Sequence, residues 1–313
     1  MTTFVNYLGS SVGASLIVAA GAVCIGALPT MAQSSFEAQF DGISKRLKSV
    51  WDEEVVAAAR MAYPEIDVNL MRQVSFEIPD DACDINVSID PNAKRFVVPI
   101  SHNYYIFTLM YAQTSLAYLK FGSDFSSADE TVSQTRQAMN PQMSTYYELC
   151  NGERGEGLQV RAPMMEILGS PEAYLDLQEE MNSLPGIRGD ADEIAGLPIF
   201  FVTLHEYGHV HLGHVSAIPS PEEEFEADMF AANVLARAEL PIVFGTYGLI
   251  LYDSISLRRD RRELNCRLQE LARMSREERP VQSEFWVAGE ERRRLERLTA
   301  ALETSFETEC TQR

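Results

Sequence analysis

Apolar side chains recur every three or four residues near the start of the chain, at Phe36, Phe40, Ile43, Leu47 and Val50. This spacing is that of an amphipathic helix with one buried face. We therefore expect residues 35–62 to begin with such a helix. It should end before Pro64, because proline cannot continue a helix.

A different pattern, strict alternation of apolar and polar residues, follows at Ile85, Val87 and Ile89. A turn sequence, Asp90-Pro91-Asn92, separates it from a second apolar run that begins at Phe96. The combination predicts a β-hairpin within residues 84–100. Most of the remaining patterns are helical, and they fall in residues 102–121, 171–184, 240–252 and from 253 to the end, with a break near Pro280.

The apolar run Leu197–Leu204 leads directly into a group of histidines without any turn signal between them. We expect these histidines to lie on a buried helix, with Pro198 near its start and Gly213 as its stop. A glycine within a helix costs stability, so Gly208 indicates that another element packs closely there.

Four of the five histidines of the chain lie within ten residues, at positions 205, 209, 211 and 214. His205 and His209 belong to an H-E-x-x-H motif, and this spacing places both on one face of a helix. Two such imidazoles can share a zinc ion, and Glu206 then lies beside it as a proton acceptor. His211 lies about 200° around the helix from His209, on the opposite face.

A second helix is predicted downstream of the histidines. Ser220 is the expected N-cap, Pro221 occupies the first helical position, and Glu223 completes a capping box. The helix should continue to Arg237, because Pro241 limits it.

The apolar stripe of this helix consists of Ala227, Ala231, Val234, Leu235 and Ala238. Glu224 and Asp228 fall on the same stripe, where an unpaired carboxylate is costly, and a zinc ion with its histidines would supply the partner. Glu224 is thus the expected third ligand, with His214 as the alternative. Asp228 is placed to orient a ligand histidine. Acidic residues in the first turn of a helix interact favourably with the helix dipole. This interaction would explain Glu222 and Glu223, but not Asp228 in the second turn.

The H-E-x-G-H motif, followed by a helix with E-x-x-A-D-x-F-A-A, resembles the gluzincin metallopeptidases, especially the compact ImmA/IrrE-like and HtpX-like zinc peptidases. The resemblance covers residues 197–240. Residues 83–100 more weakly resemble a group of bacterial metallopeptidases known mainly from sequence. The resemblance implies a zincin-like domain with one zinc ion. The resemblance implies His205, His209 and Glu224 as zinc ligands and Glu206 as the catalytic base. It implies Asp228 as the residue that orients a ligand histidine.

The resemblance implies hydrolysis of a peptide or protein substrate. Together with the export signal at the N-terminus described below, it leads us to expect an exported zinc metallopeptidase. Such enzymes often stabilise the oxyanion with a Tyr or His, for which the sequence offers Tyr207, His211, His214 and Tyr247 without a clear match. The alternative function is a non-catalytic zincin-like zinc-binding protein that binds or scaffolds a partner.

The N-terminus predicts export. Residues 12–28 are apolar, and small residues follow at Thr30 and Ala32, which is typical of a secretory signal peptide cut after Ala32. The alternative is an uncleaved membrane anchor over residues 12–28. A periplasmic or secreted protein can form disulfides, and we favour Cys83–Cys150 with Cys266–Cys310 over four unpaired thiols.

The composition is that of an ordinary globular protein with a net charge of −20, which argues against a nucleic-acid or anionic-membrane partner. The predicted organisation has three parts: residues 1–32 as the signal peptide, 33–252 as the metallopeptidase domain and 253–313 as a helical C-terminal arm. The expected fold class is α+β and mostly helical.

Overall fold

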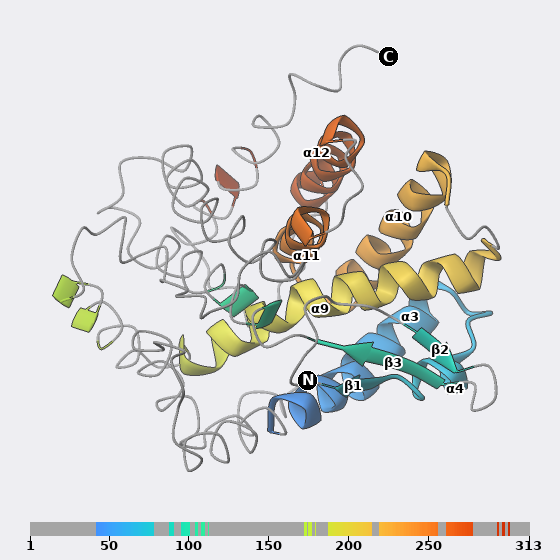
Figure 1. The fold of residues 1–313 in the computed structure, drawn as a ribbon, viewed down its shortest axis with the longest axis horizontal. Helices are drawn as coiled ribbons and strands as arrows, with labels where there is room; N and C mark the ends of the chain where they lie inside the picture. The colour runs from blue at the N-terminus through green and yellow to red at the C-terminus, as the bar shows by residue number, and fades with distance from the viewer. Residues whose placement is uncertain are drawn as a thin grey trace, which may run out of the picture.

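The computed structural model describes residues 42–77, 88–90, 95–100, 187–214, 219–255 and 261–277, with single helical positions within 104–112, 172–179 and 293–300. These residues form mostly helices and one three-stranded sheet, as expected for an α+β protein. Figure 1 shows the long helix α9 (Ile187–Leu212) running through the middle of the molecule.

The N-terminal helical run confirms the first sequence prediction where it is described. Residues 42–50 are helical and continue through the π-helical turn η1 (Trp51–Val55) into α3 (Val56–Ala62), which ends before Pro64. The indole of Trp51 is fully buried, and its Nε1 donates a hydrogen bond to the carbonyl of Met71, 2.8 Å away, at the end of the short helix α4 (Val68–Met71). This bond ties α4 to the first helix.

The two arms of the predicted hairpin pair as expected where they are described, and its turn and Ile85 and Val87 lie outside the described residues. Strand β2 (Ser88–Asp90) pairs antiparallel with β3 (Arg95–Pro99), with Ile89 opposite Phe96. A further strand, β1 (Ser75–Glu77), pairs parallel with β3 and gives the order β1-β3-β2. Strand β1 could not be predicted, because its three residues are too few to show an alternating pattern.

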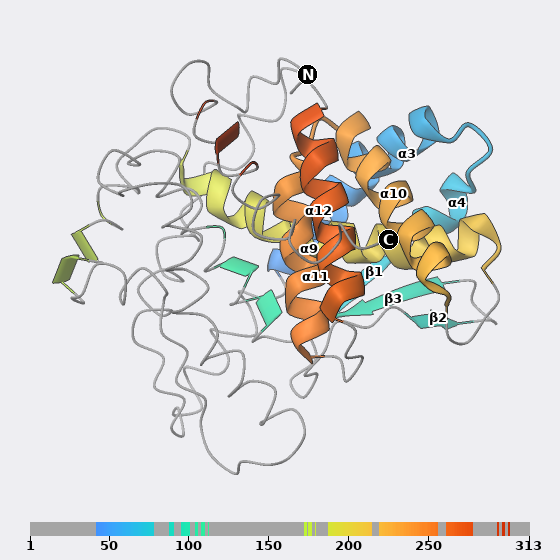
Figure 2. The same ribbon diagram turned by 90° about the horizontal axis from the view of Figure 1, so that it is seen from above.

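The buried half of α9 lies between the sheet and two further helices. In Figure 1 the sheet lies below α9, whereas α11 (Ile242–Ile255) and α12 (Arg261–Glu277) lie above it. Figure 2, seen from above, shows α12 and α11 stacked over α9. On the sheet side, the Phe200 ring lies 5.9 Å from that of Phe76. Burial on both sides explains why this part of α9 is apolar all round.

The position of Pro198 differs from the sequence prediction. We expected it near the start of the motif helix, but α9 begins at Ile187 and Pro198 lies inside it. An internal proline costs an isolated helix about 3 kcal/mol. Here the flanking residues are buried, and a Cβ at Gly248 of α11 would lie only 2.5 Å from the Pro198 carbonyl oxygen. Tertiary packing therefore outweighs the local preference.

Several predictions concern residues outside the described part of the chain, including the signal peptide or anchor. Of the cysteines predicted to pair, only Cys266 is described, on α12, so both disulfides stay predictions. The proposed boundary between residues 252 and 253 falls within α11. None of the described helices is long and apolar enough to cross a membrane.

Candidate metal centre

The close crossing of α9 and α10 (Pro221–Arg237) defines the site. At Gly208, between the two motif histidines, an added Cβ would lie 3.1 Å from Cδ1 of Phe230 and 3.3 Å from Cα of Ala227. The absence of a side chain thus allows α10 to pack directly on α9. The expectation that an element packs closely at Gly208 is confirmed.

The start of α10 is fixed by the predicted capping box. The Glu223 amide donates to Oγ of Ser220 at 3.2 Å, and the Ser220 amide donates to Oε2 of Glu223 at 2.7 Å. This cap sets the helical phase, which points Glu224 and Asp228 towards α9. Asp228 is 1% exposed, so the predicted burial of a carboxylate on this stripe is confirmed.

His205 is held by two carboxylates from α10. Its Nδ1 lies 2.9 Å from Oδ1 of Asp228, and its Nε2 lies 3.3 Å from Oε2 of Glu224. The imidazole is 5% exposed. Asp228 therefore contacts one ring nitrogen, as the sequence predicted, and the other nitrogen faces Glu224.

The atoms of His205, His209 and Glu224 converge on one point. The two Nε2 atoms are 3.2 Å apart, and Nε2 of His209 lies 4.0 Å from Oε1 of Glu224. One ligand atom from each residue lies within 4.8 Å of the others. A tetrahedral zinc with bonds of about 2.0–2.1 Å needs ligand atoms about 3.3 Å apart. His205 meets that requirement with both His209 and Glu224, whereas His209 and Glu224 lie farther apart. The three residues thus form a group that could hold a metal ion.

His214 joins the site through a turn. Gly213 has φ of +77°, and the chain closes α9 with bonds from the His214 amide to the His209 carbonyl at 2.8 Å and from the Gly213 amide to the Val210 carbonyl at 3.3 Å. This is a Schellman motif. It brings Nδ1 of His214 to 2.9 Å from Nδ1 of His209. The Nε2 of His214 lies 3.0 Å from Oε2 of Glu226.

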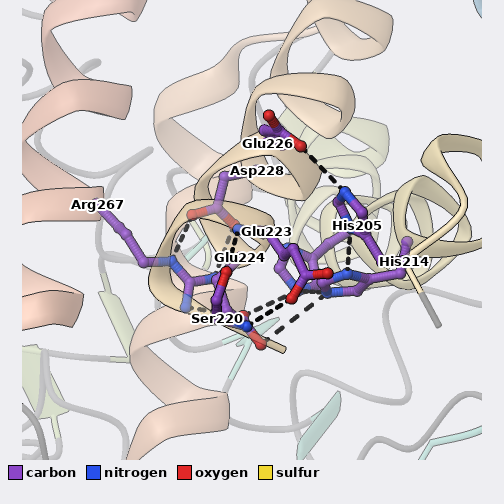
Figure 3. A network of polar contacts seen from close by, with 9 residues as sticks. His205, His214, Ser220, Glu223, Glu224, Glu226, Asp228 and Arg267 are labelled. Carbon is purple, nitrogen blue, oxygen red and sulfur yellow. Dashed lines mark hydrogen bonds and ion pairs between the residues drawn. The ribbon is translucent and has the colours of Figure 1, made fainter. Parts of the chain in front are cut away.

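Arg267 of α12 is a site residue that was not predicted from the sequence. Figure 3 shows it reaching Asp228 and Glu224 from the side. Its Nε and Nη2 donate to the two oxygens of Asp228 at 2.5 and 2.9 Å, and its Nη1 lies 3.0 Å from Oε2 of Glu224. Its place among Leu264, Leu268 and Leu271 was the available signal, because a charge on an apolar stripe needs a buried partner.

These contacts shift the ionisation of the whole cluster. Burial lowers the pKa of His205, but its hydrogen bonds to Asp228 and Glu224 outweigh burial and raise the pKa to about 9. Burial and the charge of His205 lower the pKa of His209 to about 4. Burial raises the pKa of Glu224, yet His205 and Arg267 together lower it to about 2. At neutral pH the positive charges of His205 and Arg267 thus balance the carboxylates of Glu224 and Asp228.

Two residues considered for oxyanion stabilisation, His211 and Tyr207, lie away from the metal group. His211 packs on Tyr63 and Phe230, with ring centroids 5.5 and 5.3 Å away, on the face opposite the metal group, as predicted. Tyr207 is buried and donates its hydroxyl hydrogen to the Asp67 carbonyl at 3.0 Å.

Tyr247 is buried in the hydrophobic core on α11. Glu206 directly follows His205 on α9 and is half-buried. Of the four residues considered for the oxyanion, the structure joins only His214 to the metal group by a described contact.

Comparison of the chain with protein-family models, with curated proteins and with solved structures gives no match.

Proposed function

We propose that this protein is a zinc-dependent metallopeptidase of the gluzincin type. His205, His209 and Glu224 would hold the zinc ion, and Glu206 would act as general base. The observation that carries the proposal is the convergence of two Nε2 atoms and the Glu224 carboxylate on one point, with Nε2 of His205 at tetrahedral ligand spacing from both Nε2 of His209 and Oε2 of Glu224.

The donor chemistry supports zinc over harder cations. Two imidazole nitrogens and one carboxylate are typical of catalytic zinc sites, which keep a fourth position for water. Magnesium and calcium instead prefer sites made of oxygen ligands. Asp228 accepts a hydrogen bond from Nδ1 of His205, which leaves Nε2 as the nitrogen that faces the ion.

The reaction follows from the residues around that position. When bound, zinc lowers the pKa of a coordinated water and polarises the scissile carbonyl. Glu206 accepts the proton of the water as it attacks and then delivers that proton to the leaving amine. His205 and His209 keep their orientation during the reaction because Asp228 and His214 hold their second ring nitrogens.

Two variants separate metal binding from chemistry. Glu206→Gln should retain zinc, measured by elemental analysis, and lose peptide hydrolysis by at least about 10²-fold, because the amide cannot accept the proton. Glu224→Ala should lose both zinc and hydrolysis. The control is Glu222→Gln, an exposed glutamate of α10, which should match the native protein in both assays.

The competing function is a non-catalytic zinc-binding protein that binds a partner. It predicts stoichiometric zinc in the native protein without cleavage of any member of a peptide library. Peptide hydrolysis that survives Glu206→Gln would also contradict the proposed mechanism.

A further inference from the structure

We propose that His214 and Glu226 act as the positioning pair of His209, holding its imidazole in the orientation and tautomer that a metal requires. This inference rests on the proposed metal centre and assigns His214 a role other than metal ligand or oxyanion donor. It is carried by hydrogen bonds and by the turn at Gly213.

The contact between the two imidazoles restricts their protons. Nδ1 of His209 and Nδ1 of His214 lie 2.9 Å apart, so one nitrogen must donate and the other must accept. Nε2 of His214 lies 3.0 Å from a carboxylate oxygen of Glu226, which only accepts. A neutral His214 therefore carries its proton on Nε2 and accepts at Nδ1. His209 must then carry its proton on Nδ1.

That tautomer is the one that a metal ligand needs. With its proton on Nδ1, His209 presents a bare Nε2 towards Nε2 of His205, 3.2 Å away, and towards Glu224. The reverse tautomer would place a hydrogen in the metal position. It would also turn a bare Nε2 of His214 against the negative oxygen of Glu226. The Glu226 carboxylate thus selects the metal-ready form of His209 through His214.

The backbone makes His214 a fixed partner. The His214 amide is bonded to the His209 carbonyl at 2.8 Å, so the two residues are joined through both backbone and ring. The side chain of His214 is only 8% exposed, although that of Glu226 is 62% exposed.

Zinc affinity of the purified full-length protein, measured by competition with a chromophoric chelator, tests the assignment. Loss of an orienting partner of a metal ligand typically costs 10- to 100-fold in affinity, so His214→Ala should bind zinc about 10- to 100-fold more weakly. His214→Asn should recover most of the loss, because its amide oxygen can accept from Nδ1 of His209. Glu226→Ala should lie between His214→Ala and the native protein.

The matched control is Glu222→Ala, which removes the same charge from an exposed position one turn earlier on α10. Its affinity should stay within about twofold of the native value, because it removes charge without touching His214. Equal losses in Glu222→Ala and Glu226→Ala would reduce the effect to general electrostatics and overturn the inference.

Nitrogen NMR of the histidine rings supplies a second readout. In the zinc-loaded native protein, His209 should be protonated on Nδ1 and His214 on Nε2, with no metal-induced shift of either His214 nitrogen. A metal shift at His214 would make it a ligand and overturn the inference. So would native affinity in His214→Ala. A native protein that binds no zinc would overturn the metal centre itself, which separates that failure from one confined to His214. Circular dichroism identifies a variant that fails to fold, and the test then rests on His214→Asn and Glu226→Ala.

Discussion

The two histidines of the H-E-x-x-H motif are held in opposite ways. The partner of His205 is Asp228, a carboxylate that is 1% exposed and paired with Arg267, whose side chain is 13% exposed. The network behind His209 ends at Glu226, whose side chain is 62% exposed. One ligand is thus anchored in the core and the other is connected to solvent. Stability and metal binding should therefore depend differently on the two networks.

The largest expected effect is that of Asp228→Ala on stability. The change leaves the guanidinium of Arg267, whose side chain is 13% exposed, with Glu224 as its remaining described carboxylate partner. We therefore expect a loss of about 3 kcal/mol, the lower end of the range for breaking a buried ion pair. Chemical denaturation in the presence of a chelator measures the loss without any contribution from bound metal. Glu226→Ala should cost at most about 1 kcal/mol, because its hydrogen bond to His214 is exposed. Similar losses in the two variants would break the comparison.

A smaller effect is expected where α10 crosses α9. In Gly208→Ala the new methyl group would contact Phe230 and the backbone of Ala227, which requires α10 to shift. We expect a net loss of about 1 kcal/mol, since overpacking outweighs the gain in helix propensity. Zinc affinity should also fall, because Glu224 moves with α10. Gly42→Ala is the control: nothing lies within 4 Å of its Cβ position, so stability should stay equal or rise.

The smallest effect lies at the other end of α10. Glu239 has φ of +60° in the turn that closes this helix, where its amide donates to Ala236. Glycine adopts that conformation without steric strain, so Glu239→Gly should stabilise the fold by up to about 1 kcal/mol. Thermal denaturation measures the gain, and zinc affinity should not change. If the zinc affinity falls, the two ends of α10 are coupled. Metal binding would then depend on more of the fold than the contacts next to the two histidines.

Much of the site could be predicted because it is encoded locally. His205 and His209 follow from helical spacing, and the capping box at Ser220 fixes which face of α10 carries Glu224 and Asp228. Both inferences need only the periodicity of a helix and the cost of an unpaired buried charge.

The features of the site and fold that could not be predicted depend on packing between segments. The position of His214 depends on the left-handed conformation of Gly213, and a stop signal alone does not show where the next side chain points. Arg267 stands out as a charge on an apolar stripe, but its partner follows only from the docking of α12. The internal position of Pro198 and the parallel pairing of β1 likewise depend on tertiary contacts that outweigh local preferences.

The distances along the chain between the site residues bear on the order of folding. The three ligand candidates span 19 positions (224 − 205), and the capped helices α9 and α10 carry all of them. The pair of Asp228 and Arg267 spans 39 positions (267 − 228). Short closures lose less chain entropy and favour early contacts. We therefore expect the helical hairpin of α9 and α10 to belong to the folding nucleus, with the arginine docking onto a ligand cluster that has already formed.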